Sequence, residues 1–528
     1  MAQSMAYIVE AARPAAKRLS PGLGRFLPSG QPMREPRLKP ACIALFVATV
    51  LLMLARVVPL PGWMPMVGPE VLGLPVRVLA RIILYTAALL LLFASYVYAL
   101  HCVRHNDHSR LSRIVLLFTA LLTVPAILNP DLYSNDVYGY IFYGRMVEVH
   151  GLNPYVTLPS KSPSDPFLGR VDWRNLLSPY GPLWTTWSAL INKLVPGGVY
   201  AHVIAFKVAA ALTHLLNAVL IGAIVHKASP QHSALAMAVY GWNPLPLTEF
   251  AGNAHNDSLM LLGVLGALYA YFHRRAVVGA LLLGLAISIK FTAALFVPLY
   301  VFALVQGTGT VREKARRLVV LGVAILSVWF VSWIPYMTDG GWRRMYTLPP
   351  QSAWYLNSLP AVAYNGLRDL MVWVANAGQW NLAPIRAGDL ADALIRVLSV
   401  LLILAVGLRL ARRIKERSDL VEVWFWFLFA YIFFIGPYFW PWYATTLVSL
   451  AAISRRRYVW LVTTVLSLTA MAVYSCSNCR SYFRFADSAM TGLFIFLLPL
   501  LALAVLILID TMEAAPPAEG IERLVEVG

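Results

Sequence analysis

The sequence predicts an all-α polytopic membrane protein, and three observations support this class. The chain of 528 residues is 59% hydrophobic but only 13% charged, whereas soluble domains are roughly 25% charged. Apolar runs of about 18 residues or more recur along the chain, and each is long enough to cross the ~30 Å hydrocarbon core of a bilayer. The runs do not alternate as barrel strands do, so their backbone hydrogen bonds must be satisfied within helices.

The formal net charge of +18 does not indicate a nucleic-acid partner, because the basic residues are spread over the ends of the apolar runs. Short cytoplasmic connectors carry an excess of Lys and Arg. We therefore interpret residues 1–40 as a basic cytoplasmic arm, 41–511 as the membrane domain and 512–528 as a cytoplasmic tail. The arm lacks the early apolar region of a cleaved signal peptide.

Starting from a cytoplasmic N-terminus, the pattern predicts about 12–14 transmembrane helices. The lower number holds if some short segments are re-entrant. The run 277–306 is too long for one simple helix, so we expect two short spans with a break near Lys290. The expected spans are 41–59, 78–101, 114–128, 200–226, 233–250, 257–272, two within 277–306, 318–335, 392–410, 421–436, 439–453 and two more before the tail.

Two long segments, 129–199 and 336–390, then fall on the outer face, where we expect interfacial helices. Every strongly basic short connector falls on the opposite face, as the positive-inside rule requires. A CxxC pair, Cys476 and Cys479, lies in the last outer loop. No second pair accompanies it, so we predict no zinc site, while a local disulfide is possible on an oxidising side.

The stretch NPDLYSNDVYGYIFYGR, Asn129–Arg145, places two acids and four tyrosines at a membrane boundary. Asp136, oriented by Asn135 and Tyr138, could act as a general base, and Asp131 is a second candidate. We count Arg145 among the possible substrate ligands. The alternative is an interfacial loop with hydrated acids and a belt of tyrosines.

The stretch WNPLPLTEFAGNAHNDSLM crowds Glu249, His255, Asn256 and Asp257 around one helix junction. Ionisable groups at membrane depth are expensive, so they are candidates for substrate binding. Their spacing matches no metal-binding motif, and we predict neither a metal nor a cofactor. The alternative is a polar turn in which Asn256 or Asp257 caps the next helix.

Lys290 interrupts an apolar run in SIKFTA. A lysine at this depth either extends to the headgroups or meets an anion, and phosphate suits its point charge. Other outer cations, each also a possible headgroup anchor, are Arg343, Arg344, Arg480 and Arg484.

Aromatic residues accompany these charges. Three aromatic stretches could line a groove for a sugar or a polyprenyl chain. They are GLNPY, SPYGPLW with Tyr180, and GPYFWPWY with Trp442 and Tyr443. Packed turns and an aromatic belt are the alternative. The chain contains no P-loop and no GxSxG nucleophile elbow.

Six stretches, taken in order, resemble the C-type (GT-C) membrane glycosyltransferases. They are SNDVYGYIFYGR, GLNPY, YGPLW, WNPLPLTEFAGNAHNDSLM, IKFTAALFVP and PYFWPWY. Over about 115–445 the chain is most similar to the bacterial polyprenyl-phosphate-mannose-dependent α-1,6-mannosyltransferases. The resemblance implies a multi-pass protein of the bacterial plasma membrane with an active site facing the periplasm or exterior. It also implies a polyprenyl-phosphate-linked sugar donor, most simply mannose, a glycan or glycolipid acceptor, and Asp136 as the catalytic acid of the first outer loop.

Two other functions stay open on the sequence. A transporter or flippase of lipid-linked sugars would bind near the bilayer midplane through broken helices or inverted repeats, whereas here the polar residues cluster at one face and no repeat is visible. An O-antigen-type ligase or polymerase would also work on the outer face, but we would expect it to use a diphosphate donor.

Overall fold

The computed structural model describes residues 37–57, 70–71, 74–106, 110–130, 133–307, 309–347, 353–378, 384–454, 456–476 and 488–514. Several predictions fall outside these residues: the arm up to residue 36, Asp131, Cys479, Arg480, Arg484 and the tail beyond 514. The description below concerns the compact unit from Leu38 onward.

Each expected span corresponds to a helix, which confirms the all-α polytopic class. The helices are α2 (Leu38–Val57), α3 (Val76–Arg104), α4 (Leu111–Leu128), α7 (Val199–Ala228), α8 (Ser233–Gly241), α10 (Asp257–Phe272), α11 (Ala276–Ile289), α12 (Val297–Val305), α13 (Val311–Trp333), α15 (Pro384–Ala411), α16 (Asp419–Ala430), α17 (Thr445–Ile453), α18 (Arg457–Cys476) and α19 (Ser488–Ala514). In the described part of the chain, eight helices are long and apolar enough to cross a membrane, and shorter apolar helices lie between them. The protein is therefore an integral membrane protein.

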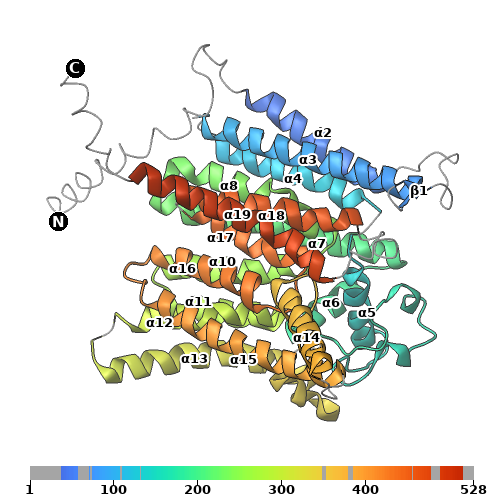
Figure 1. Cartoon of the computed structure of the whole chain (residues 1–528). Coiled ribbons are helices and arrows are strands. Elements are labelled where there is room, and N and C mark those ends of the chain that lie inside the picture. Colours follow the sequence, from blue (N-terminus) through green and yellow to red (C-terminus); the bar gives the residue numbers. More distant parts are fainter. Residues whose placement is uncertain are drawn as a thin grey trace, which may run out of the picture. The chain divides into compact units, whose positions relative to one another are not determined.

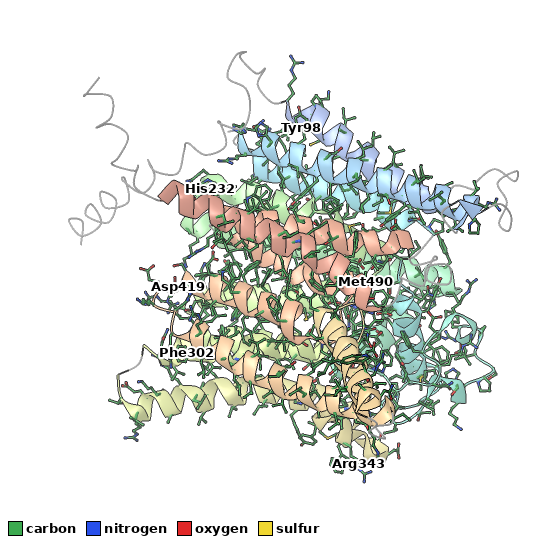
Figure 2. The ribbon with its side chains drawn as sticks, in the orientation of Figure 1. Tyr98, His232, Phe302, Arg343, Asp419 and Met490 are labelled. Carbon is green, nitrogen blue, oxygen red and sulfur yellow. The ribbon has the colours of Figure 1, made fainter. Side chains whose placement is uncertain are left out.

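Three further helices occupy the two long segments, as expected. They are α5 (Asp136–Glu148) and α6 (Pro182–Leu194) in the first segment and α14 (Leu359–Ala377) in the second. Figure 1 shows α5 and α6 together at one end of the bundle. In Figure 2, His232 and Asp419, from two connectors expected to be cytoplasmic, lie at the end opposite Arg343. The only strands among the described residues are β1 (Glu70–Val71) and β2 (Leu74–Pro75), which form one short antiparallel pair.

The predicted break near Lys290 is confirmed. The helix α11 ends at Ile289, Lys290 is extended (φ −148°, ψ 120°), and the 3-10 helix η6 (Phe291–Phe296) leads into α12. A second interruption follows α8, where α9 (Pro244–Pro246) and the π-helix η5 (Leu247–Gly252) replace a continuous helix. Both interruptions place polar residues where regular helices would present an apolar wall.

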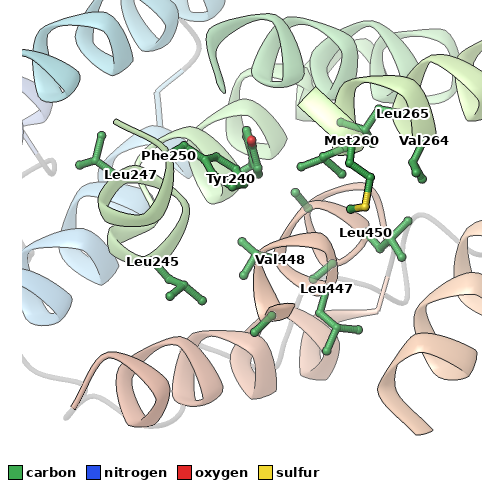
Figure 3. Packing of buried hydrophobic residues seen from close by; sticks show 14 of the residues in the cluster. Tyr240, Leu245, Leu247, Phe250, Met260, Val264, Leu265, Leu447, Val448 and Leu450 are labelled. Atoms are coloured by element: carbon green, nitrogen blue, oxygen red, sulfur yellow. The ribbon is translucent and has the colours of Figure 1, made fainter. Parts of the chain in front are cut away.

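Apolar packing around these interruptions holds the helices together. Figure 3 shows side chains of α8, η5, α10 and α17 that belong to one buried cluster, including Tyr240, Phe250, Val264 and Leu447. Gly263 on α10 permits a close approach to α11, because a Cβ there would lie 2.9 Å from the Cβ of Ala286. The polar residues of η5 and of the start of α10 are therefore fixed on a rigid frame.

Candidate active site

Asp136 is the first residue of α5, directly after the N-cap position of Asn135. The backbone N–H of Asp136 donates to Ser134 Oγ at 3.3 Å, and its side chain is 19% exposed. Burial raises the pKa of the Asp136 carboxyl above its ordinary value, while the neighbouring His255 and Lys290 oppose that rise. A carboxylate with a raised pKa and an open side is suited to accepting a proton.

Behind Asp136 lies a buried polar network built by the η5–α10 junction. His255 Nδ1 is 4.0 Å from Asp136 Oδ2, and His255 Nε2 is 3.3 Å from Glu249 Oε2. The His255 ring stacks on Trp442 at a centroid distance of 4.0 Å. Glu249, fully buried, accepts hydrogen bonds from Tyr474 at 2.7 Å and from the Asn253 amide at 2.9 Å.

The alternative interpretation of this junction as a simple helix cap does not describe it. Asn256 occupies the N-cap position of α10, but its side chain makes no capping hydrogen bond. Its side-chain oxygen instead accepts from the Tyr140 hydroxyl at 3.5 Å, and the same hydroxyl lies 3.2 Å from His255 Nδ1. The side chain thus serves the polar network rather than the helix end.

Lys290 and Asp257 form a second buried unit. Lys290 Nζ donates to Asp257 Oδ2 at 2.7 Å, and the two side chains are 12% and 3% exposed. The ammonium also lies 4.8 Å from the centroid of the Tyr443 ring. Because Lys290 follows the end of α11, its side chain reaches the first turn of α10 rather than the membrane surface.

A close backbone contact brings the first loop segment to this pair. The Gly181 N–H donates to the Ile289 carbonyl at 3.0 Å, and a Cβ on Gly181 would collide with the backbone of Ser288. Only glycine allows this approach, which carries the adjacent Tyr180 into the site. Tyr180 packs edge-on against Tyr140 at a centroid distance of 4.8 Å.

These side chains meet in one cavity of about 930 Å³. Its polar end is lined by Asp136, Trp173, Tyr180, Asp257, Lys290, Trp442 and Tyr443. The rest is an apolar groove between η6–α12, α15 and the end of α16. Residues of these elements that line it include Phe291, Leu295, Leu299, Phe302, Ile403, Leu404, Leu408 and Leu428.

The second long segment covers the polar end. Trp354 packs on Trp173 and on Tyr438 at centroid distances of 5.7 and 5.9 Å. The backbone beside it pairs with the aromatic tip, since the Leu356 N–H donates to the Pro437 carbonyl at 2.9 Å. Both long segments and the aromatic tip are therefore joined around Asp136.

Other predicted site residues lie outside the cavity lining. Arg145 pairs with Asp165 at 2.9 Å and packs over Phe167, which organises the first long segment. Asn135 donates to Asp172 at 2.9 Å, and Tyr138 packs against the apolar core.

The two predicted arginines of the second segment also lie elsewhere. Arg343 is exposed beside the Trp342 ring, and Arg344 donates to the Tyr155 carbonyl at 3.3 Å. Of the outer cations that we considered in the described residues, Lys290 alone lines the cavity. Among those residues, no cluster of three or more His, Cys, Asp or Glu side chains could hold a metal ion.

The lining residues that were not predicted from the sequence include Trp173, Tyr355 and Arg396. Arg396 had a detectable signal, because it follows Asp392 by four residues at the start of an apolar span, and charges at such depth are rare. Trp173 and Tyr355 stand in long segments rich in aromatic residues, where nothing local distinguishes them.

Comparisons with known proteins place this chain in a family. The family model described as "Alpha-(1->6)-mannopyranosyltransferase, N-terminal domain" matches residues 43–306, half of the chain. Alpha-(1->6)-mannopyranosyltransferase A of Corynebacterium glutamicum is 34% identical over 187 residues, which cover 34% of this chain and 37% of the relative. The protein of the same name in Mycobacterium tuberculosis is 28% identical over 188 residues, 35% of this chain and 36% of the relative.

The chain thus aligns with little more than a third of the length of these relatives. The family match is broader, and it contains Asp136, Glu249, His255, Asp257 and Lys290. On the extent of that match, the chain belongs to the alpha-(1->6)-mannopyranosyltransferase family.

Proposed function

We propose that this protein transfers mannose from a polyprenyl-phosphate donor to a glycan or glycolipid acceptor on the outer face of the bacterial plasma membrane. The family and the printed names of the relatives support mannosyl transfer. The donor, the outer-facing site and the mechanism are our own proposals.

One observation carries the donor proposal: a single cavity joins Asp136 and Lys290 to an apolar groove. The groove residues of α15, from Arg396 to Ala411, recur at spacings of three and four, so they form one helix face. At 1.5 Å per residue this face is about 22 Å long. A lipid chain linked to a phosphosugar needs such an arrangement, with the anion at the polar end and the hydrocarbon along the groove.

In the proposed reaction, an acceptor hydroxyl attacks the anomeric carbon of the donor sugar. The bond from that carbon to the phosphate oxygen breaks, and polyprenyl phosphate leaves without needing a proton. Asp136 takes the proton of the attacking hydroxyl as general base. A single displacement inverts the anomeric centre, so a β-linked donor yields an α-mannoside.

Charge in the cavity fits this assignment of roles. Lys290 lines the polar end together with Asp136 and pairs with Asp257 at 2.7 Å, and an arriving phosphate would share it with Asp257. Arg396 lines the same cavity, where its guanidinium is paired with Asp392 at 2.8 Å. Phosphate release after transfer is eased because Asp257 can again pair with the freed ammonium.

The test is transfer of radiolabelled mannose from polyprenyl-phosphate-mannose to a synthetic mannoside by the purified protein in detergent. A general base contributes about 10²–10⁴-fold, so Asp136→Asn should reduce the rate by that factor. Asp339→Asn is the matched control, since Asp339 is exposed and its φ of 55° is one that asparagine tolerates.

The same assay with added EDTA measures any requirement for a divalent metal. Transfer by the wild type that persists in Asp136→Asn would refute the base assignment. Movement of the labelled lipid across a vesicle bilayer, without transfer, would favour the transporter instead.

A further inference from the structure

A second cleft of about 940 Å³ adjoins the donor cavity on the side of the second long segment. It lies between α14 and α15, and two residues, Tyr355 and Arg396, line both cavities. The family match ends at residue 306, so it contains none of the residues of this cleft. Its other lining residues include Tyr364, Arg368, Asp369, Trp373, Gly388, Asp389 and Asp392.

We propose that this cleft binds the acceptor glycan and delivers its reacting hydroxyl to Asp136. The inference rests on the proposed transferase function, because a transferase needs a second substrate site that opens onto the donor. Ligand pockets are typically about 300–1,000 Å³, so the cleft has room for a short oligosaccharide.

The aromatic residues of the cleft suit a sugar. Tyr355 and Tyr364 stack at a centroid distance of 4.2 Å with their planes 7° apart, and Trp373 is 67% exposed. Large aromatic rings offer an apolar face together with a polar edge, and the C–H face of a hexose packs on such a surface. Gly388 leaves space beside Tyr364 in the cleft, since a Cβ there would lie 3.0 Å from the Tyr364 hydroxyl.

The polar residues favour hydroxyl groups over an anionic lipid headgroup. Arg368 is paired with Asp369 at 2.8 Å, and Arg396 with Asp392 at 2.8 Å, so both positive charges are already balanced. Asp389 adds a further carboxylate, and carboxylates accept strong hydrogen bonds from hydroxyl groups.

The junction between the two cavities is organised rather than open by chance. The Tyr355 hydroxyl donates to Asp392 at 3.0 Å, and Asp392 also pairs with Arg396. Tyr355 and Arg396 line both cavities, and Asp392, which lines the acceptor cleft, contacts both of them. A glycan that hydrogen-bonds to Asp392 would therefore have its terminal sugar directed toward the donor cavity.

The first experiment measures steady-state transfer to a synthetic α-1,6-mannotrioside by the wild type, Trp373→Ala and Asp389→Asn. We expect the KM for the trioside to rise about tenfold in each variant, with the KM for polyprenyl-phosphate-mannose unchanged. Trp342→Ala is the matched control, because Trp342 is 49% exposed on the same long segment but lines neither cavity. An unchanged trioside KM in both cleft variants would overturn the proposal.

A second experiment separates this inference from the transferase itself. Saturation-transfer NMR of the trioside with Asp136→Asn protein reports binding without turnover. Loss of the trioside signal when Trp373→Ala or Asp389→Asn is introduced into the Asp136→Asn protein would support a glycan site, even if the wild type proved inactive in transfer. Retained trioside binding in these variants, or displacement of the trioside by anionic lipid, would contradict it.

Discussion

The helices α7 and α15 are nearly alike in sequence character but differ in their surroundings. Their apolar spans have 30 and 27 residues and mean hydropathies of 2.1 and 2.3, respectively. In the apolar stretch of α7, however, 50% of the residues are buried in the protein, against only 11% in that of α15. The helix α7 lies within the part that the family model matches, whereas α15 lies beyond it. Hydropathy thus identifies a span but does not show whether it supports a rigid site or borders an open groove.

The largest effect should come from the rigid region, at Lys290. In Lys290→Met the carboxylate of Asp257, 3% exposed, loses its partner at 2.7 Å. Leaving a buried charge unpaired costs about 3–5 kcal/mol, so the thermal midpoint in detergent should fall markedly. The double variant Lys290→Met/Asp257→Asn should recover that stability but not the transfer activity. Recovered transfer would show that Lys290 does not hold the donor phosphate.

The pH dependence tests the other charge of the polar end. Burial raises the pKa of Asp136, and a general base works only when deprotonated. The transfer rate should therefore fall at pH values where an ordinary carboxyl, with a pKa of about 3.9, would still be ionised. A pH–rate profile that stays flat through this range would contradict a buried base.

The raised pKa of Asp136 also predicts the direction of a stability effect. A carboxyl whose pKa is raised on folding contributes stability below its unfolded pKa and loses that contribution as the pH rises through the folded value. At neutral pH the ionised Asp136 is thus a cost, and Asp136→Asn should be at least as stable as the wild type while inactive. Thermal melts of both proteins across this pH range measure the difference.

A moderate effect is expected on the groove side, where α15 offers a matched pair. Leu404 and Leu401 are both 57% exposed, but only Leu404 lines the groove. Leu404→Trp should obstruct the lipid chain and raise the KM for a long-chain donor about tenfold, while Leu401→Trp should not. The difference should shrink with a short-chain donor, and equal behaviour of the two variants would place the lipid elsewhere.

Much of this arrangement follows from local sequence, because spans and their breaks depend on nearby residues. The interruption at Lys290, the interfacial helices of the two long segments and the polar junction at His255 were all expected. The pairing of Lys290 with Asp257 was not, since each residue had its own local explanation. That faces of α12, α15 and α16 form the apolar part of the groove was not predicted either, because hydropathy gives no information on which helix faces meet.

The smallest effect is expected at Arg343, where sequence reasoning suggested a phosphate ligand. Its side chain is exposed beside Trp342 and lines neither cavity. Surface substitutions of this kind change stability by no more than about 0.5 kcal/mol, so Arg343→Ala should leave both the melting temperature and the donor KM within about twofold of the wild type. A large rise in the donor KM would instead show that the donor's phosphate reaches beyond the polar end of the cavity, and the groove along α15 would then have to be entered from the side of the second long segment.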